Sequence, residues 1–235
     1  MTSLDREPKS YVVRQGLEHI LLELEVGDTV PPERELAARF EVSRETVRQA
    51  LHELLVEGRI ERRGRGTVVS RPKLTQPLSL RSYTEGALLY GRVPSRVVVT
   101  WEDLVADDTL ATDLALPPKS PVMHLERVLL ADGERIGLES TYLPKSRFGD
   151  FRQTFDPTTS LYAAIRASGV EFGEATERIE TVLASPREAA LLESTTAMPM
   201  LLMHRKTLDT NGVSIECIRS LYRGDRIAFV ATLTR

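Results

Sequence analysis

Apolar residues recur every three or four positions in the first part of the chain, the spacing of helices with one buried face. The pattern predicts a first helix over residues 11–24 and a second that follows the Pro31-Pro32 pair. A third helix begins at Ser43, a residue type that caps helix N-termini, and Gly58 ends it. The second and third helices are only about three residues apart, as in a helix-turn-helix.

Alternating segments follow the third helix. Residues 59–63 ("RIERR") and 67–70 ("TVVS") predict two short strands around a glycine-rich tip. A glycine-rich loop that ends in Ser could also cradle the phosphate of a nucleotide. A nucleotide-binding loop joins a strand to a helix, however, and no helix is expected here. The order of elements therefore favours a hairpin that extends the helix-turn-helix.

Beyond residue 80 the hydrophobic period changes from helical to alternating. Several long strands are expected, with short helices between them, and the pairs Asp132-Gly133 and Asn211-Gly212 predict tight hairpin turns. The fold class is therefore α+β. We expect a winged helix-turn-helix domain over residues 1–70, a proline-containing linker over residues 71–79, and an antiparallel-sheet domain over residues 80–235.

The net charge of −3 argues against a nucleic-acid partner, but the distribution of charge argues for one. Residues 59–73 contain six Lys or Arg residues and a single acidic residue, Glu61. Local charge decides binding to a phosphate backbone, because salt screens distant charges. A solvated basic loop would have the same composition. Its position directly after a helix-turn-helix favours contact with DNA.

Other bulk features exclude several protein classes. Cys217 is the only cysteine, so a disulfide within one chain and a cysteine-based zinc cluster are impossible. No apolar stretch approaches the ~18–20 residues of a membrane-spanning helix. The first residues have no apolar core of a secretion signal. We expect a cytoplasmic protein with no membrane partner.

The third helix and the hairpin carry the candidate DNA contacts. In a helix-turn-helix the second helix of the motif enters the major groove with its N-terminal end first. Arginine there can bind guanine edges or phosphate, hydroxyl and amide side chains can bind bases or phosphate, and a helix N-terminus attracts phosphate. These criteria select Ser43, Arg44, Thr46, Arg48 and Gln49 on the helix, with Arg63 and Arg65 on the hairpin.

The segment "TVPPERELAARFEVSRETVRQALHELLVEGRIERRGRGTVVS" resembles the winged-helix domain of the GntR superfamily of bacterial transcription regulators. The resemblance covers most of residues 11–70. It implies DNA contacts by Arg34 of "PPER", by Ser43, Arg44, Thr46 and Arg48, and by Gly66, which enters the minor groove at the wing tip. The family often has an aromatic residue where this chain has Val68. We expect Val68 to pack inward and to alter core volume rather than DNA contact.

Residues 80–235 resemble the UTRA domain of the HutC subfamily, the effector-binding half of such regulators. The matching segments are "SYTEG" at 82–86, "LERVLLADGERIGLEST" at 125–141, "TSLYAAI" at 159–165 and "SIECIRSLYRGDRIAFV" at 214–230. They are especially similar to the regulators that control the use of N-acetylglucosamine. The UTRA fold is related to chorismate lyase.

This resemblance implies a phosphorylated amino sugar as effector, such as glucosamine-6-phosphate or N-acetylglucosamine-6-phosphate. Its phosphate needs cationic and hydroxyl donors, and the matching positions are Thr84, Arg127, Ser160 and Tyr162. Its hydroxyl and amino groups need acceptors, and the matching positions are Glu139, Glu216 and Tyr222. Tyr83 supports the pocket wall or contributes its backbone N–H.

One position departs from the pattern. The amino-sugar regulators usually have Arg-x-Arg where this chain has Arg127-Val128-Leu129, so the second phosphate-binding arginine is missing. Either a Lys or Arg from elsewhere substitutes for it, or the effector is a metabolite without a phosphate. Without the resemblance, Arg127 and Glu139 would be interpreted as a cross-strand ion pair on a solvated face.

Catalysis is the remaining alternative. The four histidines are scattered along the chain, and no Ser/His/Asp set or metal-binding spacing is present. Glu139 and Glu216 could form an acid/base pair, but they serve equally as ligand acceptors. Arg223, Asp225 and Arg226 of "RGDR" are expected to form a turn with an ion pair. We expect a regulator with no enzymatic activity, no cofactor and no metal.

The expected mechanism is that of a homodimeric repressor. A single winged module buries too little DNA for tight specific binding, so two modules would bind a pseudo-palindromic operator. The small-molecule effector would change the spacing of the two modules through the linker. The operator, the regulated genes and the direction of the effector's action are open.

Overall fold

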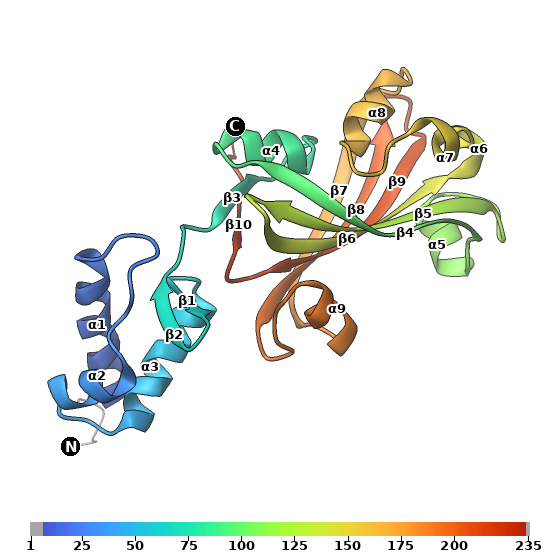
Figure 1. Cartoon of the computed structure of the whole chain (residues 1–235). Coiled ribbons are helices and arrows are strands. Elements are labelled where there is room, and N and C mark those ends of the chain that lie inside the picture. The colour runs from blue at the N-terminus through green and yellow to red at the C-terminus, as the bar shows by residue number, and fades with distance from the viewer. Residues whose placement is uncertain (1–6, 234–235) are drawn as a thin grey trace. The chain divides into compact units, whose positions relative to one another are not determined.

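The computed structural model describes residues 7–233, so the outer ends of the two expected domains, residues 1–6 and 234–235, lie outside the described residues. The chain divides into two compact units (Figure 1). Unit 1 contains the chain up to Lys73 together with Gly224–Arg226, and unit 2 contains Leu74–Arg223 and the chain from Ile227 onward.

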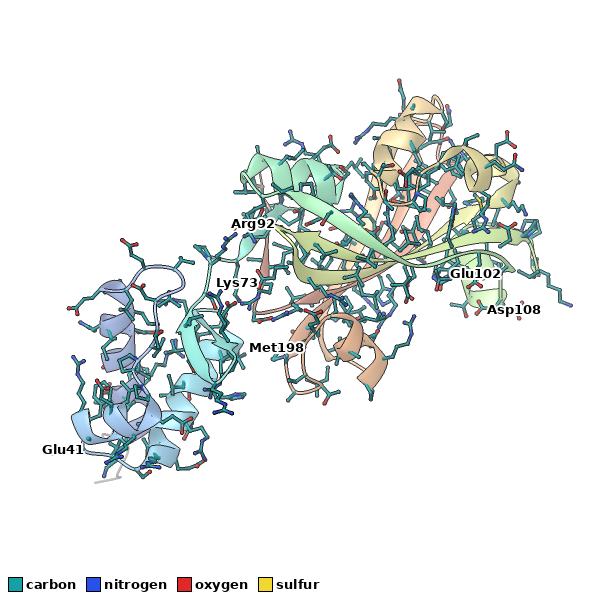
Figure 2. All side chains as sticks on the ribbon, in the orientation of Figure 1. Glu41, Lys73, Arg92, Glu102, Asp108 and Met198 are labelled. Carbon is teal, nitrogen blue, oxygen red and sulfur yellow. The ribbon has the colours of Figure 1, made fainter. Side chains whose placement is uncertain are left out.

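Unit 1 begins with the three expected helices, α1 (Lys9–Leu22), α2 (Glu33–Arg39) and α3 (Arg44–Val56). Their apolar faces form one core that includes the fully buried residues Leu17 and Leu36. Ser43 caps α3 as predicted, because its Oγ accepts a hydrogen bond from the backbone N–H of Thr46 at 3.2 Å. Glu41 makes the turn before α3 in the left-handed region, at φ 53° (Figure 2).

The expected hairpin is present as β1 (Ile60–Arg63) and β2 (Gly66–Val69), paired antiparallel with Arg63 opposite Gly66. Gly64 adopts a φ of +59° at the tip, a conformation that glycine adopts without strain. Val68 is buried, as expected, and pairs with Thr29 from the segment between α1 and α2.

A distant piece of chain completes unit 1. Arg226 forms an ion pair with Glu61 of β1 at 2.6 Å and approaches Asp225 at 3.6 Å, so the expected ion pair of "RGDR" extends to the hairpin. Gly58 makes room for this piece, because a Cβ there would lie 2.0 Å from the carbonyl oxygen of Asp225. Lys73 donates a hydrogen bond to the carbonyl oxygen of Gly224 at 2.6 Å.

Unit 2 is built on a six-stranded antiparallel sheet. Its order is β4 (Pro94–Val105), β5 (Pro121–Ala131), β6 (Glu134–Pro144), β9 (Ser214–Arg223), β8 (Pro199–Asp209) and β7 (Phe172–Leu183). Asp132 and Gly133 both have positive φ in the β5–β6 turn, as the hairpin signal predicts. The observed fold is the expected combination of helices and an antiparallel sheet.

Short helices cover both faces of this sheet (Figure 1). One face carries α4 (Tyr83–Leu89), α6 (Lys145–Phe148), α7 (Phe151–Thr154) and α8 (Leu161–Ala167), and the other carries α5 (Asp108–Asp113) and α9 (Pro186–Leu191). Strand alternation separates the two cores: Leu129 packs with α4, whereas its neighbour Val128 packs with α9.

The expected linker contains regular structure. Residues Leu74–Pro77 form β3, which pairs in parallel with β10 (Ile227–Val230). Leu74 and Gln76 are buried and Thr75 is half-buried, so buried and half-buried residues alternate over the four residues of this strand. Within residues 7–233, no helix is long and apolar enough to cross a lipid bilayer.

Candidate DNA-binding surface and ligand pocket

The exposed face of α3 carries the polar side chains that the sequence selected. Val47, Ala50 and Leu54 point into the core of unit 1, so Arg44, Arg48 and Gln49 lie on the opposite, exposed side. Thr46 is half-buried, and its hydroxyl lies 2.9 Å from Ser43 Oγ at the helix N-terminus. We use the name arginine face for Ser43, Arg44, Thr46, Arg48 and Gln49 together with Arg34 and the hairpin residues Arg62, Arg63 and Arg65.

The arginines of this face divide into two groups. Arg34, Arg44 and Arg65 make no side-chain hydrogen bond or ion pair with any described residue, whereas Arg63 pairs with Glu61 at 2.8 Å. Arg48 contacts Glu45 at 2.8 Å and Glu33 at 3.2 Å. The hydrogen bond that Arg48 donates to Glu33, followed by the charges of Glu33 and Glu45, raises the pKa of Arg48.

Two residues that contact one another at the arginine face, Glu33 and Arg62, escaped the sequence analysis. Glu33, at the start of α2, also lies 3.7 Å from Arg62 on β1, so one carboxylate connects α2, α3 and the hairpin. Arg62 in turn donates to Thr67 Oγ1 at 2.8 Å. The sequence places Glu33 and Arg62 far apart, and only the folded unit brings them to Arg48.

The predicted effector residues gather around one pocket of unit 2, on the sheet face covered by α4 and α8. We call it the sheet pocket. Six predicted residues line it: Tyr83, Arg127, Glu139, Ser160, Tyr162 and Tyr222. Thr84 and Glu216 do not line it, but each contacts a residue that does. Gly137 allows the Tyr222 ring to lie against the sheet, because a Cβ there would be 2.6 Å from that ring.

Arg127 and Glu139 do form a cross-strand pair, at 2.6 Å, but the pair is not on a solvated face. Their side chains are only 3% and 12% exposed. Arg127 also donates to the carbonyl oxygens of Thr159 at 3.0 Å and Pro157 at 3.3 Å, in the loop before α8. Three acceptors therefore hold the guanidinium at the pocket wall, and its Nε is left without a partner.

A second polar network lies beside the pocket. Glu216 is fully buried and its Oε1 accepts hydrogen bonds from Tyr162 at 2.5 Å and Thr207 at 3.0 Å, whereas Oε2 has no partner. Burial raises the pKa of Glu216 to about 7. Arg205 lines the pocket, donates to the Tyr162 hydroxyl at 2.9 Å and pairs with Glu177.

Arg96 is a pocket residue that the sequence analysis missed. It lies on the edge strand β4, directly opposite Leu129 in the register with β5. Its guanidinium donates to Thr84 Oγ1 at 2.5 Å and lies 5.4 Å from the centre of the Tyr83 ring. No carboxylate of the described residues pairs with it, and its Nε is buried without a partner. The sequence signal would have been strand alternation on β4 combined with the correct β4–β5 register.

The histidines do not converge on a site. His124 stacks on Tyr142 with ring centres 4.6 Å apart and approaches Glu102 at 3.3 Å, on the sheet face opposite the pocket. His52 is exposed on α3. Among residues 7–233, no group of three or more His, Cys, Asp or Glu residues is arranged to hold a metal ion.

Comparison with known protein families agrees with both halves of this description. Residues 12–69 match the family model "Bacterial regulatory proteins, gntR family", and residues 89–228 match the UTRA domain. The first match covers the helix-turn-helix and its hairpin, and the second covers the sheet and its helices.

Named relatives are similar over nearly the whole chain. The HTH-type transcriptional repressor PhnF of Mycolicibacterium smegmatis is 51% identical, over 96% of this chain and 92% of the relative. The HTH-type transcriptional repressor NagR of Bacillus subtilis is 35% identical, over 91% of this chain and 88% of the relative.

A crystal structure of PhnF from Mycobacterium smegmatis matches this fold with a TM-score of 0.71, over 94% of this chain and 99% of that one. Its 51% identity agrees with the sequence comparison. The similarity thus extends through both units, from the helix-turn-helix to the six-stranded sheet. The chain belongs to the GntR family of bacterial transcription regulators, in the HutC-type group whose second domain is a UTRA domain.

Proposed function

We propose that this regulator is a homodimeric repressor that binds a pseudo-palindromic operator and is controlled by a small phosphorylated effector in the sheet pocket. The observation that carries the proposal is the coexistence of an exposed arginine face on a GntR-type helix-turn-helix with an arginine-lined pocket in the UTRA domain. The relatives PhnF and NagR are both named repressors, which supports the direction of regulation.

The arginine face supports operator binding at residue level. Arg44 and Arg48 would reach base edges in the major groove, and Thr46, Gln49 and Ser43 would bind bases or phosphates. Arg34 and the hairpin residues Arg63, Arg65 and Gly66 would complete the contact with the backbone and the minor groove. Gly66 has no positive φ, and a Cβ there would meet only the Arg63 carbonyl at 3.8 Å. We therefore attribute the glycine to close approach of DNA rather than to the fold.

Dimerisation follows from the small size of the single DNA-binding module. One winged module buries about 600–1,000 Å² of protein surface on DNA, below the usual size of a tight specific interface. Two modules related by a two-fold axis would bind half-sites about one helical turn apart. We propose that the UTRA domains make the dimer contact, and that the complex acts on chromosomal DNA in the cytoplasm.

The chemistry of the sheet pocket supports a phosphorylated amino sugar. Arg127 supplies a cation, Ser160 and Tyr162 supply hydroxyl groups, and Glu139 supplies an acceptor for hydroxyl or amino groups. Thr84 would position Arg96, which donates a hydrogen bond to it, and Glu216 would position Tyr162 in the same way. A metabolite without phosphate is the second candidate, because Leu129 stands where the amino-sugar regulators have arginine.

A chorismate-lyase-like enzyme is the remote alternative. Against it, Glu139 pairs with Arg127, and one oxygen of Glu216 accepts hydrogen bonds from Tyr162 and Thr207. A ligand that stabilises the protein and is recovered unchanged supports a sensor. Turnover of chorismate or of a sugar phosphate by the purified protein would support the enzyme instead.

The test begins by selecting the operator from a random duplex pool with the purified full chain. Fluorescence anisotropy then measures the selected duplex with glucosamine-6-phosphate, N-acetylglucosamine-6-phosphate, the unphosphorylated sugars and inorganic phosphate. We expect two protomers per duplex and a change in operator affinity with at least one phosphorylated compound. A monomer on the DNA, or a response to unphosphorylated sugars alone, would contradict the corresponding part of the proposal.

A further inference from the structure

Arg96 lies directly opposite Leu129, the position where the amino-sugar regulators have an arginine. Leu129 is fully buried among Tyr83, Met203 and Tyr222, on the strand where the amino-sugar regulators carry their second arginine. Arg96 is directly opposite Leu129 on the neighbouring strand β4. Directly paired residues of antiparallel strands project to the same face with Cβ atoms about 4.5–5.5 Å apart. The guanidinium of Arg96 therefore enters the same pocket that an arginine at position 129 would enter.

Arg96 is a half-buried cation with no carboxylate among the described residues in contact with it. Burying a guanidinium is costly unless a carboxylate or another anion pairs with it. Arg96 has the Thr84 hydroxyl and the Tyr83 ring, both neutral, and its Nε has no partner. Burial lowers the pKa of Arg96, and the charge of Arg127 lowers it further.

The other pocket arginines are already neutralised or solvated. Arg127 is paired with Glu139, and Arg205 is paired with Glu177. Arg81 also lines the pocket and has no partner among the described residues, but its side chain is exposed, so water solvates its charge at no cost. Arg96 is thus the pocket cation that gains most from an anionic ligand.

We propose that Arg96 is an effector-binding residue that supplies, from β4, the second cation for the anionic group of the ligand, in place of the arginine missing at position 129. This rests on the proposed function of the sheet pocket as an effector site. The anion lies between Arg96 and Arg127, which both line the sheet pocket, and Leu129 belongs to the apolar core behind it. The ligand class is a small molecule with a tetrahedral oxyanion, either inorganic phosphate or a phosphate ester.

The inference predicts a large loss of anion affinity on removing Arg96 alone. Losing one charge-assisted hydrogen bond weakens binding by roughly tenfold to more than a hundredfold. Isothermal titration calorimetry with inorganic phosphate and with glucosamine-6-phosphate measures this on the full chain at constant ionic strength. Arg96→Leu should show the loss and should melt no lower than the parent protein, because it removes a half-buried charge that has no carboxylate partner among the described residues.

Further variants test whether the loss of affinity comes from the charge at Arg96, from its position in the pocket, or from removing any arginine. Arg178→Leu removes an exposed arginine of β7, whose side chain is 70% exposed and pairs with Glu180 at 2.8 Å, and it should bind the anion like the parent. The exchange Arg96→Leu/Leu129→Arg returns a guanidinium to the pocket from β5 and should recover at least tenfold of the lost affinity. Arg96→Lys should retain an intermediate affinity and gives a second test if Arg96→Leu fails to fold.

Three results would overturn the inference. They are unchanged anion binding by Arg96→Leu or Arg96→Lys, equal affinities of Arg96→Leu and the exchange variant, and no binding of either phosphate compound by the parent protein. If the parent protein binds neither phosphate compound but a neutral sugar releases it from the operator, the anion site is refuted and the proposed role as an effector-controlled repressor stands. Failure of the parent to select any operator would refute the proposed function, while phosphate binding that depends on Arg96 would stand.

Discussion

The arginine face of unit 1 and the sheet pocket of unit 2 use the same residue type in opposite environments. On the arginine face, the side chains of Arg48, Arg62 and Arg63 are 54%, 51% and 64% exposed. In the pocket, Arg127 is 3% exposed and held by three acceptors. Exposed cations pay little desolvation and bind a polyanion through counterion release, which salt opposes. Buried cations are fixed in advance and select a small anion by geometry, with weaker dependence on salt.

The largest expected effect comes from removing the two helix arginines together. Each good bidentate contact with a base contributes about 1–3 kcal/mol of discrimination, so Arg44→Ala/Arg48→Ala should weaken operator binding by two to four orders of magnitude. Anion binding in the sheet pocket should not change. Arg39→Ala, at the exposed end of α2, is the matched control. Anisotropy and calorimetry on the same preparations measure the two affinities, and a loss in both would break the separation between the two regions.

The second prediction concerns Glu216, the fully buried carboxyl group beside the sheet pocket, whose ionisation is shifted by burial. The pKa of Glu216 is raised by burial to about 7, whereas an unfolded Glu has a pKa near 4.3. Between these values the folded protein retains a proton that the unfolded chain has lost. The free energy of unfolding therefore falls as pH rises through this window, by up to about 3 kcal/mol.

Glu216→Gln removes this term and should flatten the dependence of stability on pH between about 4.5 and 7. Urea melts of parent and variant at several pH values measure the difference. Carboxylates with lowered pKa values, such as Asp209 and Glu126, change stability only in more acidic solution. They are present in both the parent and the Glu216→Gln variant, so they do not affect the comparison. Parallel stability curves for parent and variant would show that Glu216 is already ionised in the folded protein.

The comparison also explains what the sequence could predict. Unit 1 and the long strands depend on local signals, such as the Ser43 cap and the Asp132-Gly133 turn, and these were confirmed. Helix α4 was missed although its capping box, Ser82 with Glu85, is a local signal that could have revealed it. The six predicted residues that line the pocket were selected only because the chain resembles a family whose ligand residues have known positions.

The remaining features depend on contacts between distant parts of the chain. The strand β3 exists because β10 pairs with it, and the two are about 150 residues apart in the sequence. Arg226 joins unit 1 through Glu61, again across the length of the chain. Arg96 became a pocket residue only when the register fixed Leu129 as its neighbour. Local patterns contain no information on any of these pairings.

A smaller effect is expected at the hairpin tip. Arg65 is exposed and has no partner among the described residues, so it can neutralise one DNA phosphate without breaking an existing contact. Arg65→Ala should weaken binding to operator and to unrelated duplex alike, and it should lower the slope of log affinity against log salt by about one. Arg178→Ala, on the other unit, serves as the control. An unchanged slope would remove the hairpin tip from the phosphate contacts.

The smallest effect is expected at Glu33. This carboxylate holds exposed arginines of the arginine face, much as Glu139 holds the buried Arg127 in the pocket. It holds Arg48 at 3.2 Å and Arg62 at 3.7 Å, but exposed pairs of this kind contribute only about 0–1 kcal/mol. In the complex the same carboxylate would also be repelled by the DNA phosphates. Glu33→Gln should therefore bind unrelated duplex a few-fold more tightly while its preference for the operator decreases, because the two arginines lose their fixed orientation. The ratio of the two affinities, compared with Glu35→Gln on the same helix, measures this. If the ratio of operator affinity to unrelated-duplex affinity is preserved, the DNA itself orients the exposed arginines. If the ratio decreases, Glu33 orients them before DNA binds, as Glu139 does for Arg127.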